Sequence, residues 1–205
     1  YTFSCNGWLK DFNPKANEQD KLALGFHIAG MFNKVIDINK CYLQNNFANT
    51  LRNYIRELAF ELKLSFYNVK EFTGFLRNII IRNTIDNQWM LVVVFGYEDI
   101  ELQNIFLEKI KNKFSEITSL MYVINTKRND TINDLSVKLY SGLPYITEQM
   151  HHLNFKIGTV SFYQTNPLQA VNLYSVVKEF AGLTGNETVY DLYTGTGTIA
   201  QYIAK

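Results

Sequence analysis

A glycine-rich segment near the C-terminal end of the sequence constrains the fold more than any other feature. Residues 188–200 read TVYDLYTGTGTIA, which is typical of a short apolar strand, a tight loop and the first turn of a helix. Gly195 and Gly197 allow positive φ angles and let a ligand approach the backbone, because glycine has no Cβ. The N–H groups of a helix that begins near Thr198 would point at whatever occupies the turn. Doubly wound α/β sheets hold nucleotide-like cofactors in this way at the carboxyl end of their first strand.

The same glycine spacing fits more than one kind of site. Gly-x-Gly-x-x-Ala occurs in dinucleotide sites and in S-adenosylmethionine sites, and a glycine-rich turn without any ligand is a third interpretation. The sequence ends at Lys205, whereas a Rossmann-type sheet needs several further β-α units to bury its first strand on both faces. We therefore expect the sequence to be part of a longer protein, and Tyr1 at its start indicates the same for the N-terminal side.

Composition and charge exclude several classes of protein. The 205 residues are 47% hydrophobic and 19% charged, which is typical of a globular protein rather than a disordered one. The formal net charge of +1 gives no global attraction to nucleic acid or membranes, so any RNA contact must depend on a local patch. No segment reaches the roughly 18 apolar residues of a membrane span. Cys5 and Cys41 are too few for a disulfide framework, and we expect a reducing, cytoplasmic location.

Apolar periodicity predicts an α+β arrangement over most of the chain. Helices are expected over residues 44–64, 99–114 and 166–183, with Asp99 as an N-cap and with Arg52, Arg56 and Lys63 pointing away from the first helix's apolar face. Strands are expected over residues 1–9, 24–30, 34–38, 74–83, 89–95, 119–125, 135–140, 145–148 and 153–157, with turns at Asn6-Gly7 and Asp86-Asn87 and a polar surface loop over 11–22. The strand-rich pattern ends near Gly158, so we expect two domains, residues 1–157 and residues 158–205.

Two motifs in combination carry a resemblance to a known family. Phe162-Tyr163-Gln164-Thr165-Asn166 is followed, after a predicted helix, by Asp191-Leu192-Tyr193-Thr194-Gly195-Thr196-Gly197. This pairing resembles the bacterial RNA (uracil-5-)-methyltransferases, which modify 23S ribosomal RNA or transfer RNA. The resemblance extends back through residues 140–142, 146–148, 35–41 and 24–26, and so covers nearly the whole chain. It implies an α+β central domain that contacts RNA, followed by the first, incomplete β-α unit of a Rossmann-like S-adenosylmethionine methyltransferase domain.

The resemblance also implies roles for individual residues. Gln164 matches a glutamine that contacts S-adenosylmethionine, and Phe162 matches an aromatic beside the cofactor and the flipped target base. The remaining expected cofactor-binding positions belong to the glycine-rich motif and are Asp191, Tyr193, Gly195, Gly197 and Thr198. Two plainer interpretations stay open, namely that Phe162 is a core aromatic at the domain hinge and that Gln164 is a solvated or helix-capping residue.

Cys41 matches the last of four cysteines that hold a 4Fe–4S cluster in some members. The other three cysteines are absent from the sequence, and one thiol cannot hold a cluster that needs about four ligands. A cluster is therefore expected only in a longer protein, with Cys41 as its fourth ligand. The sequence departs from the family pattern again at Thr194, where a cysteine is usual. His27, His151 and His152 show no metal-binding spacing.

The family reaction needs a nucleophile that this sequence does not offer near the motifs. Carbon 5 of uracil attacks a sulfonium methyl group only after a cysteine thiolate has added to C6, and a general base then removes the C5 proton. Neither Cys5 nor Cys41 lies in the expected cofactor domain. We therefore expect the nucleophile and the base to lie beyond this chain, and we expect the chain alone to be inactive.

Several functions remain open at this level. The first is methylation of 23S ribosomal RNA by a longer parent protein, with transfer RNA as the alternative substrate. The second is a dinucleotide-dependent oxidoreductase with the same glycine loop, although the Phe-x-Gln-x-Asn element favours a methyltransferase. The third is a non-catalytic RNA-binding module built on residues 1–157. Its phosphate contacts would come from a patch that includes Lys34, Lys40, Arg52, Lys127 and Arg128, each of which could equally be solvated surface.

Overall fold

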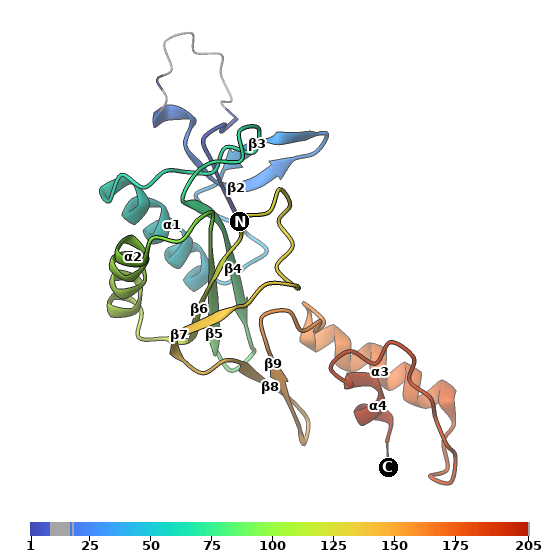
Figure 1. Ribbon diagram of the computed structural model, residues 1–205. Coiled ribbons are helices and arrows are strands. Elements are labelled where there is room, and N and C mark those ends of the chain that lie inside the picture. The colour runs from blue at the N-terminus through green and yellow to red at the C-terminus, as the bar shows by residue number, and fades with distance from the viewer. Residues whose placement is uncertain (9–16, 18, 205) are drawn as a thin grey trace.

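A mixed seven-stranded sheet forms the body of the protein in a computed structural model that describes residues 1–8, 17 and 19–204 (Figure 1). Its strand order is β3-β2-β1-β4-β5-β6-β7, and every neighbouring pair is antiparallel except β5 and β6. Strands β8 and β9 form a separate two-stranded hairpin. The strands are β1 (Thr2–Ser4), β2 (Ala23–Ile28), β3 (Met31–Asp37), β4 (Leu76–Asn83), β5 (Trp89–Phe95), β6 (Ile117–Ile124), β7 (Lys138–Gly142), β8 (Ile146–Met150) and β9 (Leu153–Ile157).

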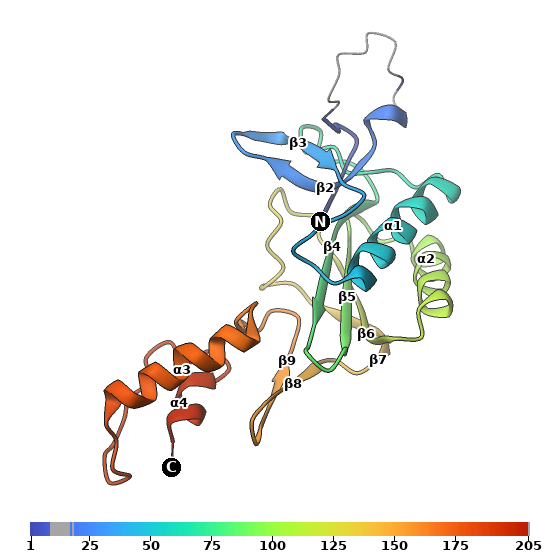
Figure 2. The ribbon, with the colours of Figure 1, turned by 180° about the vertical axis from the view of Figure 1, so that it is seen from behind.

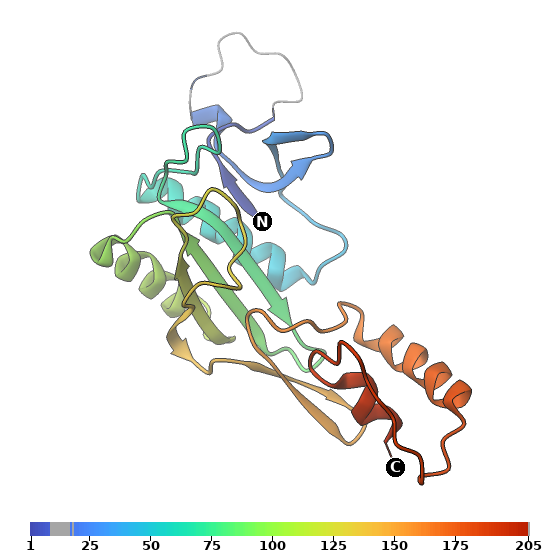
Figure 3. The same ribbon diagram turned by 45° about the vertical axis from the view of Figure 1, so that its right-hand side comes forward.

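Helices α1 (Asn46–Glu61) and α2 (Ile100–Lys113) lie side by side over one face of the sheet (Figures 1 and 2). Helix α2 is the crossover between the parallel strands β5 and β6, as a parallel pair requires. The helices α3 (Pro167–Ala181) and α4 (Thr198–Ile203) lie apart from these two, beyond the β8–β9 hairpin (Figure 3). A single turn of 3-10 helix, η1, spans Gln19–Lys21.

Strand β5 is buried along its whole length because both faces of the sheet are covered there. Its side chains alternate between two apolar clusters, as the period of two in a strand dictates. Leu91, Val93 and Phe95 pack in the cluster under α1 and α2. Met90, Val92 and Val94 pack in the second cluster, on the opposite face. The continuous apolar run of this strand is thus the signature of two-sided burial.

The second cluster connects the sheet to the C-terminal part of the chain. The β8–β9 hairpin contributes Phe155 and Ile157, and the segment after it contributes Tyr163. Helix α3 adds Ala170 and Tyr174 to the same cluster. Figure 3 shows the hairpin between the large sheet and the C-terminal helices. The hairpin therefore fixes where the segment after residue 157 begins.

Most of the predicted elements are confirmed. Helix α1 begins after Asn45, whose side chain accepts a hydrogen bond from the Phe47 amide, and α2 begins after Asp99, whose Oδ1 accepts from the Leu102 amide at 3.0 Å. The turn at Asp86-Asn87 joins β4 to β5, with Asn87 at a φ of 58°. At the predicted turn at Asn6-Gly7 the chain bends, and Gly7 then forms an isolated parallel bridge with Val35. Most of the predicted loop over 11–22 lies outside the described residues.

The predicted exposure of Arg52 is wrong. Its side chain is buried under the N-terminal strand, where the guanidinium lies over the ring of Tyr1 at 5.0 Å. It donates hydrogen bonds to Asn49 Oδ1 at 3.2 Å and to Asn53 Oδ1 at 3.0 Å. Helical periodicity misses this burial because the covering residue comes from a distant part of the sequence.

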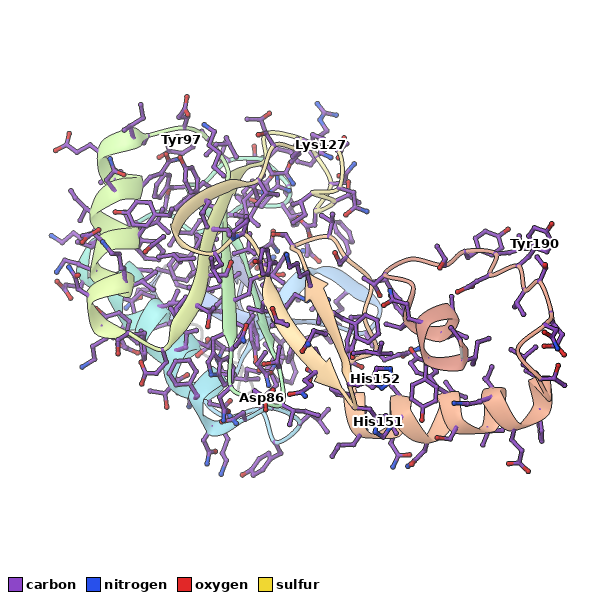
Figure 4. All side chains as sticks on the ribbon, turned by 90° about the horizontal axis from the view of Figure 1, so that it is seen from below. Asp86, Tyr97, Lys127, His151, His152 and Tyr190 are labelled. Atoms are coloured by element: carbon purple, nitrogen blue, oxygen red, sulfur yellow. The ribbon has the colours of Figure 1, made fainter. Side chains whose placement is uncertain are left out.

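The predicted strand at residues 188–190 is also absent. Val189 and Tyr190 form no ladder with any described strand, and Tyr190 is 84% exposed. Figure 4 shows Tyr190 at the edge of the molecule, far from the sheet. A strand needs a neighbour to pair its backbone groups, and none of the described strands runs beside this segment.

A buried arginine organises the polar loop at residues 125–130. Arg77 of β4 is 1% exposed, and its Nη1 donates to the carbonyl oxygens of Asn125 and Lys127, both at 2.6 Å. Its Nη2 donates to the Asn129 carbonyl at 3.1 Å and to Asp130 Oδ1 at 2.9 Å. One guanidinium therefore satisfies four acceptors of a loop that has no strand or helix of its own.

We predict that Arg77→Met lowers the free energy of unfolding by about 3 kcal/mol, because it leaves four acceptors without their donor. Urea denaturation of the two proteins measures the difference. Lys111→Met is the matched control, since Lys111 is exposed on α2 and its removal should change stability by no more than about 0.5 kcal/mol. A loss below about 1 kcal/mol for Arg77→Met would mean that the loop does not depend on this contact.

Candidate functional site

The two motifs that carry the family resemblance are in contact. Thr196 Oγ1 in the glycine loop donates a hydrogen bond to the carbonyl oxygen of Phe162, with an oxygen–oxygen distance of 3.2 Å. These residues are 34 positions apart in the sequence. Helix α3 leads the chain away from the first motif, and the segment after Gly182 brings it back to the second (Figure 3).

Local sequence signals explain how the first motif leads into α3. Asn166 is the N-cap, and its Oδ1 accepts from the Gln169 amide at 3.2 Å. Pro167 follows in the first turn, where the backbone N–H that proline lacks would have no partner within the helix. The helix ends at Gly182, which has a left-handed φ of 55°. The motif is thus held at a defined helix start rather than on a free loop.

Gln164 is half-buried beside this helix start. It lines an open groove along α3 together with Thr165, Asn166, Gln169 and Leu173. Among the hydrogen bonds of the described residues, none uses its carboxamide, so the interpretation of Gln164 as a helix cap is wrong, and the cap is Asn166. A carboxamide offers two donors and an acceptor, which suits a zwitterionic amino-acid group.

The glycine loop has the backbone conformation that its sequence predicts. Gly195 and Gly197 have φ angles of 56° and 73°, and a Cβ added to Gly195 would meet no other atom closer than 3.9 Å. Asp191 Oδ2 accepts a hydrogen bond from Thr194 Oγ1 at 3.1 Å, which ties the two ends of the loop together. The backbone around Gly195 is therefore open to a ligand, as a cofactor loop requires.

The aromatic residues of the two motifs are accessible. Phe162 is 72% exposed, so its interpretation as a core aromatic is wrong. Tyr193 is fully exposed and has a φ of 66°, which is uncommon for a residue with a side chain. Both rings are free to contact a bound molecule. Their proposed roles toward a cofactor and a base remain predictions.

Thr198 is used in packing. It is buried, and its hydroxyl lies 3.1 Å from the hydroxyl of Tyr174 on α3. Tyr202 makes a second contact between α4 and α3 through the Ser175 hydroxyl, at 2.8 Å. These two pairs hold α4 against α3 and so fix the end of the glycine loop.

The expected cofactor residues are distributed over two hollows. Gln164 lines the groove along α3, whereas Asp191 lines a cavity of about 300 Å³ with Val189 and Ala200. At the edge of that cavity, Glu187 accepts hydrogen bonds from the Thr184 hydroxyl and from backbone amides, which lower the pKa of its carboxyl to about 2. The candidate site thus consists of two open hollows, and the Thr196–Phe162 hydrogen bond links the segments that line them.

A buried acidic side chain that the motifs do not include lies beside Tyr163 of the first motif. Glu148 is 1% exposed, and its Oε2 accepts from the Ile85 amide at 3.2 Å. Burial raises the pKa of this carboxyl, and the nearby Asp86 raises it further. Burial and the proximity of Glu148 raise the pKa of Tyr163 to about 12. The alternation Ile146-Glu148-Met150 in β8 is the signal that could have shown that Glu148 points inward.

Neither cysteine lies near the two motifs in the chain. Cys5 and Cys41 are half-buried and form no disulfide, and the Cys41 amide donates to Asn49 Oδ1 at 2.7 Å. Within the described residues, no three His, Cys, Asp or Glu side chains are grouped as metal ligands would be. His151 and His152 lie at the turn between β8 and β9 (Figure 4). The ring of His151 is tilted against that of Tyr202, with 5.7 Å between the ring centres. Among the residues that the structure describes, no helix has the length and apolar content to cross a membrane.

Two of the five basic residues proposed for an RNA patch remain available with an aromatic beside them. Lys40 Nζ lies 4.7 Å from the ring centre of Tyr42, and the Arg128 guanidinium lies 4.8 Å from that of Phe72. By contrast, Arg52 is buried. The others are engaged in the structure, Lys34 with Asn6 and Lys127 with Asp134.

Comparisons with known proteins agree with the motifs. The chain is 47% identical over its whole length to an uncharacterized RNA methyltransferase of Bacteroides thetaiotaomicron and 46% identical to one of Porphyromonas gingivalis. Its structure is similar to that of the tRNA (uracil-54, C5)-methyltransferase of Pyrococcus abyssi in complex with S-adenosyl-L-homocysteine. That comparison has a TM-score of 0.67 and an identity of 26%, and it covers 83% of this chain and 41% of the other. No family model matches the chain.

These similarities confirm the resemblance to RNA methyltransferases, and the chain is a homologue of proteins with that name. It spans about half the length of these relatives, 46% and 45% respectively. Its mixed α/β fold with a seven-stranded sheet is similar to that of an enzyme whose structure contains the demethylated form of S-adenosylmethionine.

We predict that Tyr174→Phe loosens α4 from α3. The variant loses the buried contact with the Thr198 hydroxyl, which should cost about 1 kcal/mol, equivalent to about fivefold faster amide hydrogen exchange in α4. Tyr202→Phe is the comparison, because its bond to Ser175 is exposed and its loss should have a smaller effect. Equal exchange rates in wild type and Tyr174→Phe would contradict this account of the packing.

We predict that Glu148 makes stability depend on pH. Because its folded-state pKa is raised, the folded protein binds this proton more tightly than the unfolded chain, whose glutamate pKa is about 4.3. The free energy of unfolding of the wild type should therefore fall, relative to Glu148→Gln, as the pH rises from about 4 through the folded pKa. Urea denaturation at several pH values measures this difference, and a difference that does not change with pH would contradict the prediction.

Proposed function

We propose that this chain is part of an S-adenosylmethionine-dependent RNA methyltransferase that methylates C5 of a uridine in 23S ribosomal RNA. The observation that carries the proposal is the contact between the Phe162 carbonyl and Thr196 in the glycine loop. It joins the two motifs whose combination resembles the family. The names of the full-length relatives support the methyltransferase class over an oxidoreductase with the same glycine loop.

Each motif residue has a part in this proposal. Gln164 would bind the amino-acid end of S-adenosylmethionine. The open backbone at Gly195, together with Gly197, would bind its nucleoside end, with Asp191, Tyr193 and Thr198 shaping the loop. The exposed ring of Phe162 would stack on the target uracil after the base has left the RNA stack, which costs a few kcal/mol. When bound, S-adenosylmethionine supplies the methyl group.

The covalent step would use residues beyond this chain. A cysteine thiolate adds to C6 of the uracil, and C5 then takes the methyl group. A general base removes the C5 proton, and the thiolate leaves as the C5–C6 double bond reforms. Neither cysteine of this chain is beside the motifs, so we expect residues 1–205 alone to lack methyl transfer. In a complete protein with three further cysteines, Cys41 is our candidate for the fourth ligand of a 4Fe–4S cluster.

The same proposal gives the two parts of the chain different roles. Residues 1–157 would form the central α+β domain that contacts RNA, with Lys40 and Arg128 among its phosphate-binding residues. Residues 158–205 would begin a Rossmann-like domain, and the cytoplasm, where ribosomal RNA is found, would be the site of action. Transfer RNA is the second candidate substrate, because the similar structure from Pyrococcus abyssi is named a tRNA methyltransferase.

Methyl transfer from radiolabelled S-adenosylmethionine to 23S ribosomal RNA and to bulk transfer RNA, measured with the complete protein, tests this proposal. We predict labelled 5-methyluridine in the ribosomal RNA. Phe162→Ala should lower the rate by about 10- to 100-fold, as expected for the loss of one base-stacking contact. Phe180→Ala is the matched control, because Phe180 is 83% exposed on α3 and away from the motifs. Label in transfer RNA alone would favour the second substrate, and label in neither RNA would contradict the function.

A further inference from the structure

A cavity of about 380 Å³ lies between the large sheet and the segment that leads into α3. Its wall comes from four separate parts of the chain: residues 43–45 before α1, residues 81–83 at the end of β4, the β8–β9 hairpin, and residues 163–167. Figure 3 shows the end of β4 beside the segment before α3. Of the cofactor-binding residues proposed above, Gln164 also lines this cavity, whereas the residues of the glycine loop do not.

The wall of the cavity is unusually rich in carboxamides. Gln44, Asn45, Asn83 and Gln164 all line it. Most of their hydrogen-bonding groups are available. The Asn83 Nδ2 donates only to the Thr84 carbonyl at 3.2 Å, and Gln164 makes no side-chain hydrogen bond to any described residue. Asn45 uses its oxygen to cap α1, which leaves its NH₂ group, and Gln44 uses its oxygen to accept from the Tyr1 hydroxyl.

Apolar side chains form another part of the wall. Ile81, Ile146 and Ile157 line the cavity from the sheet and the hairpin, and the ring of Tyr163 lines it from the segment before α3. Three of these four residues are buried in the second apolar cluster, which fixes their positions. A flat ligand would therefore have apolar contacts for its faces and carboxamides for its edges.

The charges of the wall argue against an anionic ligand. Among the residues that the structure describes, Arg82 is the one cation that lines the cavity, and its Nη1 already donates to the carbonyl oxygens of Gly158 at 2.8 Å and Thr159 at 3.2 Å. Glu148 is the one carboxyl that lines it in the described part of the chain, and it is buried against the Ile85 amide. Phosphate sites usually draw on several cations, and the cation that lines this wall is already hydrogen-bonded to carbonyl oxygens.

We propose that this cavity binds an unstacked nucleobase of the RNA, a neighbour of the target uridine. Carboxamides pair with base edges through two hydrogen bonds, and apolar side chains contact base faces, which is the combination that single-stranded RNA recognition uses. The proposal rests on the proposed function for the identity of the nucleic acid. The location agrees, since Phe162 lies on the glycine-loop side and the next residues, Tyr163 and Gln164, line the cavity.

Binding of the four free ribonucleosides to this chain tests the proposal without any methyl transfer. With ¹⁵N-labelled protein, at least one of adenosine, cytidine, guanosine and uridine should shift the side-chain NH₂ signals of Asn83 and Gln164. Asn83→Leu should weaken that binding at least tenfold. Asn104→Leu should leave it unchanged, because Asn104 is exposed on α2 and far from the cavity in sequence. Inorganic phosphate should shift neither signal.

Three results would overturn the proposal. The first is that no nucleoside shifts either signal, and the second is that phosphate shifts them. The third is that S-adenosylmethionine shifts the Asn83 signal while the nucleosides do not. The last result would make the cavity a cofactor site. The wild-type titration gives its answer even if Asn83→Leu does not fold. Failure of methyl transfer in the complete protein, together with nucleoside binding here, would reject the proposed function and leave the base site standing as a property of an RNA-binding module.

Discussion

The two-sided burial of β5 is the constraint on which the rest of the structure depends. Leu91, Val93 and Phe95 need a layer on one face, which α1 and α2 supply. Met90, Val92 and Val94 need a layer on the other face, which the β8–β9 hairpin supplies. Because apolar burial is the dominant favourable term in folding, the hairpin is held on the sheet even though its strands pair only with each other.

The hairpin in turn positions the functional candidates. Its apolar face continues into Tyr163 and into Tyr174 of α3, so the segment between them is fixed from both sides. Arg82 adds a second tie through its bonds to the Gly158 and Thr159 carbonyls. The side chains of Phe162 and Gln164 remain accessible on this fixed segment, and the Thr198–Tyr174 contact brings the glycine loop alongside. Rigid support under accessible side chains is what a binding site requires.

Local signals predicted most of the elements, and non-local contacts account for what was missed. The cap at Asp99 and the positive φ angles of the two loop glycines follow from residues a few positions away, so the sequence predicted them correctly. The burial of Arg52 depends on Tyr1, a pairing that helical periodicity does not contain. The alternation in β8 indicates that Glu148 points inward, but not that its partner is the Ile85 amide. The strand expected at residues 188–190 requires partner strands that the described chain does not provide. The sequence therefore named the residues of the candidate site, but it did not show how those residues lie relative to one another.

The most direct test of the account is a titration of this chain with S-adenosylmethionine, followed through backbone amide signals. The central claim is that the Phe162–Gln164 segment and the glycine loop form one cofactor site, joined by the Thr196–Phe162 contact. If so, the amides of Gln164, Gly195 and Gly197 should shift together with a single dissociation constant, while those of α2 do not move. Signals that shift in only one of the two motifs, or in neither, would contradict the claim.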